Sequence, residues 1–436
     1  MNRLKLCGVV ALLFGCSLCY AESLTMTLDE CLEYAKQNSI TLQQAKLEVD
    51  NSEAAELTAK GAFYPSVSGS VSQGLNSYPL STSTDSKSSY TGSYGVDLNM
   101  TLYSGGKNRA QLKQSALGSQ MSSLELKEYE NSLEVSVTEL YVEILYAMEQ
   151  IAVAENTIEL NVRNEEHGRA FLEVGSINKA EFAQLESATV TSRYTLVTAQ
   201  SQLRNLYVAL NYLLEVPQGT QVVVKEPVIS MAELTGEIPY ANDVYGAALE
   251  SRPEIQSSKL DVEYAELSEK VAYSGYLPTL TLSAGTGVSH SSASDYTFSG
   301  QLRNNFNTSV GLNLSVPIFS RFANRSAVRI AKNNTQSAAL SLTQAEKDLY
   351  QTIETLYNNA TNAKAKYEVS VSLLSATQTS LELIQEQYNV GAKNIIELLT
   401  EQDNYNQARQ DFLTDKYQLL LNKALLNYYK TNIIKL

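Results

Sequence analysis

The chain has few of the residues that build metal sites and disulfides. It contains no tryptophan, two histidines and four cysteines in 436 residues. Three of the cysteines lie within the first 19 residues and only Cys31 follows, so no intrachain disulfide is expected beyond them and Cys31 is expected to be a small core residue. His167 and His290 lie in different predicted elements without ligand spacing around them, which argues against a zinc site.

Long hydrophobic runs and an excess of positive charge are also missing. No stretch of about 18 apolar residues follows the amino terminus, so no membrane-spanning helix is expected, and any contact with a bilayer would use strands or an anchor. The formal net charge of −14 argues against nucleic acid as a partner, because such binding needs a basic surface. No Ser-His-Asp arrangement has meaningful spacing, and "SGGKNR" at 104–109 lacks the pattern of a phosphate loop. We therefore expect neither an enzyme nor a cofactor.

The amino-terminal segment predicts export. Arg3 and Lys5 precede an apolar run that extends to Leu18, and "CYA" at 19–21 places small residues at the −3 and −1 positions of a cleavage site. Residues 1–21 are thus predicted to be a signal peptide. Lipidation is the alternative, because "LFGC" at 13–16 loosely resembles a bacterial lipobox with Cys16 as the modified residue.

The rest of the sequence is an internal duplication. "QQAKLEVDNSEAAELTAKGAFYPSVSGS" at 43–70 matches "QSSKLDVEYAELSEKVAYSGYLPTLTLS" at 256–283, and "LEVGSINKAEFA" at 172–183 matches "YNVGAKNIIELL" at 388–399. Each half reads as helix, hairpin, very long helix, break and helix. The predicted units are a first repeat at 22–216 with a hairpin at 66–102, a connector at 217–240, and a second repeat at 241–436 with a hairpin at 279–316.

Both hairpins show the period-2 alternation of strands with one apolar face. The first half places Tyr90, Tyr94, Val96, Leu98, Met100 and Leu102 against small or polar residues. The second half repeats the pattern with Phe306, Val310, Leu312, Leu314 and Val316. The sequence predicts no other sheet against which these strands could pack, and the Ser/Thr-rich segments inside the hairpins are expected to be solvent loops.

After each hairpin comes a helical pattern without proline, from about residue 106 to 174 and from about 320 to 390. At ~1.5 Å per residue each helix would be on the order of 100 Å long, which suits a coiled coil or tube rather than a globular domain.

In an exported protein, strands with an apolar outer face and a polar inner face are typical of a transmembrane β-barrel. A soluble β-sandwich would need a second sheet for the apolar face to pack against. Four strands cannot close a barrel, and lipid tolerates no open edge, so the chain must oligomerise. Two protomers would give eight strands and a filled interior, and three would give twelve strands and an open lumen. We therefore predict an α+β membrane protein: a homotrimer with a helical coiled-coil barrel and a twelve-stranded transmembrane β-barrel, four strands from each protomer.

The chain resembles the TolC-like outer-membrane efflux proteins over essentially its whole mature length. The resemblance rests on "LDECLEYAKQNS", "FYPSVSGS", "YLPTLTLS", "LYSGGKNR" and "YNVGAKNIIELLTEQDNYNQAR" in this order and spacing. It implies a passive exit duct across the periplasm and outer membrane, acting in a tripartite efflux pump or a type I secretion system. The implied partners are outer-membrane lipid, a periplasmic adaptor and an inner-membrane transporter of the RND, ABC or MFS type.

The breaks at Gly175 and Gly391 are predicted helix-to-helix turns. Glycine supplies the left-handed residue that ends a helix, and Asn178 and Asn394 are positioned to cap the next one. A glutamate follows each asparagine by three residues, which is the spacing of a capping box. Capping is by itself a sufficient account of these glutamates.

The resemblance adds a second role, since such turns form the periplasmic mouth of the tunnel. Glu181 and Glu397 match the first acidic position of the family's constriction, but Gln184 and Thr400 occupy the second, which implies a thinner acidic ring and argues against strong cation selectivity.

By the same resemblance, Lys393 and Tyr388 would latch the closed mouth, with Glu181 as their partner. A solvated lysine and a tyrosine that packs between helices are the simpler interpretations. A secreted coiled-coil adhesin or spacer without channel activity is the alternative for the whole protein, although it explains neither the lipid-compatible strands nor the matched turns.

Overall fold

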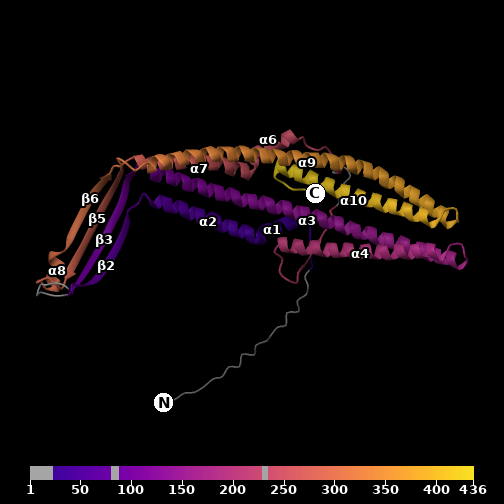
Figure 1. The fold of residues 1–436 in the computed structure, drawn as a ribbon, viewed down its shortest axis with the longest axis horizontal. Helices are drawn as coiled ribbons and strands as arrows, with labels where there is room; N and C mark the ends of the chain where they lie inside the picture. The colour runs from indigo at the N-terminus through magenta and orange to yellow at the C-terminus, as the bar shows by residue number, and fades with distance from the viewer. Residues whose placement is uncertain (1–22, 80–87, 228–233) are drawn as a thin grey trace, which may run out of the picture.

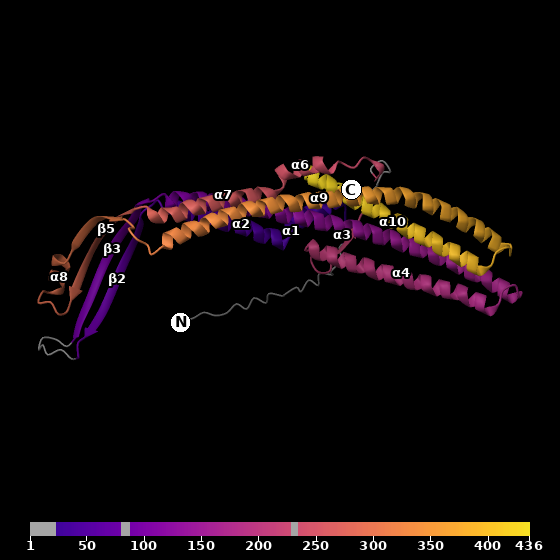
Figure 2. The same cartoon turned by 45° about the horizontal axis from the view of Figure 1, so that its top comes forward.

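The computed structural model describes residues 23–79, 88–227 and 234–436. The predicted signal peptide and Cys16 lie outside the described residues. The molecule is elongated, with strands at one end and paired helix ends at the other (Figures 1 and 2). Two helices of 67 residues, α3 (Lys107–Glu173) and α9 (Ala323–Asn389), form most of its length. At ~1.5 Å per residue each spans on the order of 100 Å, as the sequence predicted.

The duplication is visible in the order of the elements. In the first half α2 leads through the strands β2 and β3 to α3 and α4, and in the second half α7 leads through β5 and β6 to α9 and α10 (Figure 1). The bounds of the elements not given above are α2 Ile40–Gly61, β2 Ser66–Ser77, β3 Ser88–Ser104, α4 Lys179–Leu213, α7 Pro253–Tyr273, β5 Thr279–Ser291, β6 Asn307–Ser315 and α10 Ile395–Thr431.

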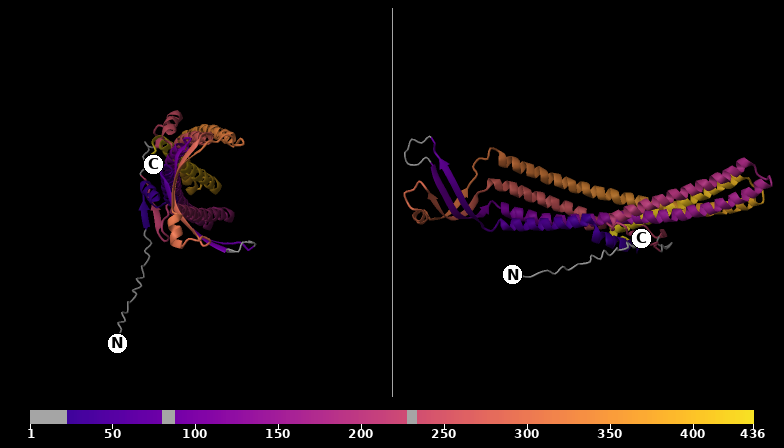
Figure 3. Two further views of the ribbon diagram at one scale, coloured as in Figure 1. Left: turned by 90° about the vertical axis from the view of Figure 1, so that its left-hand side faces the viewer. Right: turned by 90° about the horizontal axis from the view of Figure 1, so that it is seen from below.

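The four long strands form one antiparallel sheet in the order β2-β3-β5-β6. Strands β3 and β5 pair with each other, so the two hairpins become one continuous sheet although β3 ends and β5 begins far apart in the sequence. Seen from the strand end, the sheet and the helices that join it lie along an arc (Figure 3). Strands β2 and β6 lie at the edges of this sheet.

The register gives the two faces of the sheet different chemistry, because residues opposite one another in a ladder point to the same face. One face carries the large apolar side chains, for example Val71 opposite Tyr94 and Leu282 opposite Leu312. The other face carries serine, threonine, glycine, asparagine and the single aspartate Asp97. Leu312 remains 67% exposed in the single chain.

One detail of the predicted strands is wrong. The sequence pattern placed Leu102 on the apolar face in line with Met100, but the ladder shifts register between Thr101 and Tyr103, and Tyr103 takes the place opposite Leu280. Leu102 is the extra residue of this bulge. Such bulges bend a strand near the end of a sheet, which here leads into the corner before α3.

The structure also contains elements that the sequence did not predict. Strands β1 (Ser23–Met26) and β4 (Gln221–Val224) pair in parallel as a second, two-stranded sheet, so the expectation of strands only in the hairpins is wrong. Helix α8 (Phe298–Asn304) lies in the segment expected to be a solvent loop, where Gln301 donates to and accepts from the backbone of Ser291.

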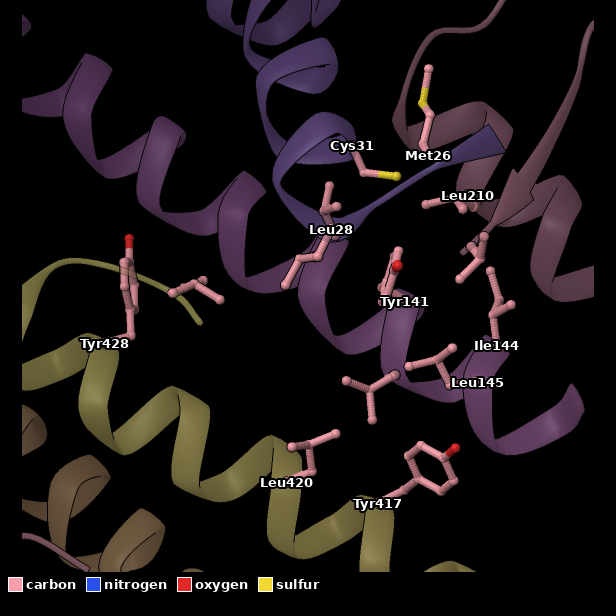
Figure 4. Packing of buried hydrophobic residues seen from close by; sticks show 14 of the residues in the cluster. Met26, Leu28, Cys31, Tyr141, Ile144, Leu145, Leu210, Tyr417, Leu420 and Tyr428 are labelled. Carbon is pink, nitrogen blue, oxygen red and sulfur yellow. The ribbon is translucent and has the colours of Figure 1, made fainter. Parts of the chain in front are cut away.

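The largest buried core surrounds the β1–β4 pair near the middle of the molecule. Figure 4 shows Met26, Leu28 and Cys31 packed on the Tyr141 region of α3, with Leu210 from α4 and Leu420 from α10 nearby. Helix α1 (Leu28–Asn38) contributes Cys31, which is fully buried as expected, and burial raises the pKa of its thiol to about 12. Helix α6 (Ala241–Ser251) packs on α9 and α10 in a second cluster.

None of the helices among the described residues is both long and apolar enough to cross a membrane.

Candidate functional site

The candidate site is the pair of helix turns at the end of the molecule opposite the strands (Figure 1). Helix α3 ends at Glu173, and Gly175 follows with a φ of 72°. The Gly175 N–H donates to the Leu172 carbonyl, and the Ser176 N–H donates to the Phe171 carbonyl at 2.8 Å. This pair of bonds is a Schellman motif, and its left-handed position favours glycine.

The second turn repeats this geometry. Helix α9 ends at Asn389, and Gly391 has a φ of 78°. The Gly391 N–H donates to the Tyr388 carbonyl at 2.9 Å, and the Ala392 N–H donates to the Gln387 carbonyl at 2.8 Å. A Cβ at Gly175 or at Gly391 would meet no other atom within 4 Å, so the backbone angle rather than crowding accounts for glycine at both positions.

Each following helix begins with a complete capping box. The side chain of Asn178 accepts from the Glu181 N–H at 3.0 Å, while the Asn178 N–H donates to the Glu181 carboxylate at 2.8 Å. Asn394 and Glu397 make the same pair of bonds at 2.9 and 3.1 Å. These bonds satisfy backbone N–H groups that have no partner inside the helix and place a negative charge at its positive end.

The capping asparagines are expected to stabilise the first turns of α4 and α10 against local unfolding. Replacing Asn394 by alanine should destabilise the first turn of α10 by about 1 kcal/mol, which corresponds to about fivefold faster amide exchange. Hydrogen-exchange mass spectrometry on peptides covering residues 391–400 would measure the change. The matching turn at 175–184 of the same chain is the internal control and should exchange at its original rate. Equal acceleration of both turns would contradict a local capping role.

Lys393 lies inside the second turn and pairs with its own helix. Its ammonium group is 2.6 Å from the Glu397 carboxylate, and both side chains are more than one-third exposed. The hydrogen bonds from Lys393 and from the Asn394 backbone hold the pKa of Glu397 below its ordinary value. The resemblance implied Glu181 as the partner of Lys393, whereas in this structure the lysine contacts Glu397.

Tyr388 is buried in the last turn of α9. It is 3% exposed, and its ring meets that of Phe171 of α3 edge-on at 5.8 Å. Burial, and secondarily the negative charge of Glu181, raise the pKa of its hydroxyl. Within the described residues this buried hydroxyl has no hydrogen-bond partner. Tyr388 thus connects the end of α9 to the first turn by packing, and Glu181 is close enough to influence it.

The residues three positions after the two glutamates, Gln184 and Thr400, carry no charge. The Thr400 hydroxyl donates to the Ile396 carbonyl of its own helix at 2.7 Å, and Thr400 is exposed. Gln184 is also exposed and lines a groove between α3, α4 and α10. Glu181 and Glu397 are therefore the acidic side chains at the starts of α4 and α10.

The sequence did not reveal the contacts that join the two helix pairs above the turns. Asn161 and Asn164 of α3 bond to Gln402 of α10, and all three side chains are at least nine-tenths buried. A signal was present, because Asn161, Asn164, Gly168 and Phe171 follow the alternating spacing of a coiled-coil seam.

Comparison with known proteins identifies relatives of both repeats of the chain. The family model described as "Outer membrane efflux protein" matches residues 31–214 and 244–427, one match in each repeat. The chain is 25% identical over 431 residues to the outer membrane efflux protein BepC of Brucella suis, covering 95% of this chain and 89% of that protein.

Two further likenesses agree with this match. Outer membrane protein TolC of Escherichia coli is 25% identical over 261 residues, which span 56% of this chain and about half (49%) of TolC. The crystal structure of the outer membrane protein VceC of Vibrio cholerae superposes with a TM-score of 0.78 at 14% identity, covering 92% of this chain and 96% of that chain. The fold is therefore that of solved outer-membrane proteins with long helices and a β domain.

Proposed function

Because the chain belongs to the outer membrane efflux protein family, we propose that it is the outer-membrane channel of a tripartite efflux pump or a type I secretion system. It gives solutes a passive exit duct across the periplasm and the outer membrane. The observation that carries this proposal is the combination of a sheet with one apolar and one small polar face and two ~100 Å helices that leave it in the same direction.

The protomers assemble as homotrimers. In each chain β2 and β6 are edges of the sheet, and an edge cannot face lipid because its backbone groups would lack partners. Pairing β6 of one protomer with β2 of the next closes twelve strands into a barrel with an open lumen. The apolar face then contacts outer-membrane lipid, and the serine- and glycine-rich face lines the lumen.

Exposed aromatic residues support this orientation, because aromatic side chains gather where a barrel meets the two membrane surfaces. Tyr78, Tyr90 and Phe298 lie toward the loop ends of the strands and are about half exposed. At the ends that join the helices, Phe319 and Phe322 are exposed and meet edge-on at 5.8 Å.

The helices extend into the periplasm and end at the paired turns. There the channel meets a periplasmic adaptor protein and, through it, an inner-membrane transporter of the RND, ABC or MFS type. In a trimer, six turns surround one axis. Glu181 and Glu397 line the constriction with Gln184 and Thr400 one turn further along, and Tyr388 and Lys393 hold the closed mouth.

The function is tested by reconstituting the purified protein into planar bilayers. Stepwise ion conductance, together with a trimer that dissociates only on heating in detergent, is the expected result. The alternative, an exported coiled-coil adhesin or spacer, predicts a protein that does not conduct and does not partition into detergent. That outcome would overturn the channel proposal.

A further inference from the structure

A cluster of buried amides joins the two helix pairs a short distance above the turns. Gln402 of α10 donates from Nε2 to the Oδ1 of Asn161, and Asn164 donates from Nδ2 to the Gln402 Oε1 at 3.4 Å. Asn161 in turn donates from Nδ2 to the Ala188 carbonyl of α4 at 3.2 Å. The exposures of Asn161, Asn164 and Gln402 are 5%, 2% and 2%. We call these three residues the amide clasp.

The clasp occupies positions where coiled coils normally place apolar residues. On α10 Gln402 continues the seam of Ile395 and Leu398, which belong to the apolar cluster around Tyr388. A polar residue at such a position lowers stability relative to an apolar one but fixes which helices meet and in which register. The cluster around Tyr388 is apolar, and the seam becomes polar immediately above it.

Two further contacts between α3 and α10 are also polar, although the apolar core around Tyr141 and Leu420 joins the same helices. The Thr157 hydroxyl lies 3.3 Å from the Asn406 Oδ1, and the hydroxyls of Tyr146 and Thr414 are 3.1 Å apart. A groove of about 560 Å³ runs beside the clasp. Hydroxyl and amide side chains, including Gln150, Thr191 and Gln410, line it together with apolar residues such as Val153 and Leu399. Amides released from the clasp would therefore have polar side chains and water of the groove within reach.

The hydrogen bonds of the clasp itself can open and close at a low cost in free energy. A hydrogen bond exchanged for water changes stability by only about 0.5–1.5 kcal/mol, whereas separating an apolar seam exposes hydrocarbon at about 25 cal/mol per Å². Closer to the turns the two pairs are also joined by the apolar cluster that contains Leu185, Tyr388 and Leu398, so the clasp adds a polar contact beside an apolar one.

We infer that the amide clasp of Asn161, Asn164 and Gln402 is a second latch of the periplasmic mouth, separate from the contacts of Tyr388 and Lys393. It holds α10 against α3 and α4 while the mouth is closed, and it releases when the α9–α10 pair moves away. These are positioning residues, since they act on the width of the mouth through the helices. The inference rests on the proposed channel function.

The test is the single-channel conductance of the full-length trimer in planar bilayers. Replacing Gln402 by alanine removes both bonds to α3 and should raise the unit conductance several-fold, and Asn161→Ala, which breaks the clasp from the other helix, should do the same. The matched control is Gln407→Ala, since Gln407 is exposed and its side chain donates to Asp411 of its own helix. The exchange Asn161→Gln with Gln402→Asn restores an amide pair and should return conductance toward the original value.

The possible outcomes distinguish failure of the second latch from failure of the channel proposal. A wild-type protein that does not conduct overturns the channel proposal, and the latch with it. A wild-type channel whose unit conductance is unchanged by Gln402→Ala and Asn161→Ala overturns the latch alone. If neither alanine variant assembles, Gln402→Asn, which shortens the amide by one methylene, is measured with the same expectation. Loss of folding lowers the number of channels but does not widen each one, so the readout is specific to the mouth.

Discussion

Replacing Tyr388 and Lys393 together by alanine is expected to raise the single-channel conductance several-fold. Tyr388 is buried between the two turns, and its loss removes the edge-on contact with Phe171 that ties the end of α9 to α3. Removing a buried aromatic side chain typically costs about 3–5 kcal/mol. Because each of three protomers would lose this contact, the closed state of the mouth should be strongly disfavoured.

Lys393 contributes less to the same result. Its pair with Glu397 is partly exposed, and exposed ion pairs are worth about 0–1 kcal/mol. Without the lysine, Glu397 keeps its capping bonds with Asn394, so the start of α10 should keep its position. The single variant Lys393→Ala should therefore change conductance little, and Tyr388→Ala should account for most of the effect of the double variant.

Two controls make this result interpretable. Tyr194→Ala removes an exposed tyrosine of α4, so it should leave conductance unchanged. Tyr388→Phe keeps the ring and removes the hydroxyl, whose pKa the charge of Glu181 helps to raise. No change is expected for Tyr388→Phe, because the hydroxyl has no hydrogen-bond partner among the described residues and the latch then rests on packing. A rise in conductance would instead assign the latch to a hydrogen bond. If the double alanine variant conducts like the wild type, the latch proposal is wrong.

The two turns could be predicted from the sequence because their signals lie within a few residues. A glycine that must adopt a positive φ and an asparagine followed three residues later by glutamate are both short-range signals, and the structure contains the corresponding Schellman bonds and capping boxes. The long helices and the two faces of the strands could be predicted equally well, because each follows from a periodicity within one segment.

What the sequence did not predict depends on contacts between distant segments. Strand β1 has only four residues, and it is a strand because β4 lies beside it almost 200 residues later. The buried state of Gln402 depends on Asn161, which lies 241 residues earlier. The contact of Lys393 with Glu397 is local, since the two residues lie one helical turn apart, whereas the family pattern pointed to the other turn.

A charge on the lipid-facing side of the sheet is expected to prevent membrane assembly, whereas the same charge one residue further should not. Leu312 lies near the middle of β6 on the apolar face, and Asn313 lies on the small polar face. An arginine that faces lipid near the bilayer midplane costs about 2–4 kcal/mol, or about 6–12 kcal/mol for the three copies of a trimer. Leu312→Arg should therefore abolish the heat-dissociable trimer and all conductance.

Asn313→Arg is the matched control, because the same side chain then projects into an aqueous lumen. This variant should assemble, but three added positive charges in the lumen should shift its ion preference toward anions, an effect that weakens as salt shortens the Debye length. The pair of variants thus tests which face meets lipid independently of the mouth. Assembly of Leu312→Arg together with failure of Asn313→Arg would mean that the faces are reversed. Equal behaviour of both would remove the basis for a barrel.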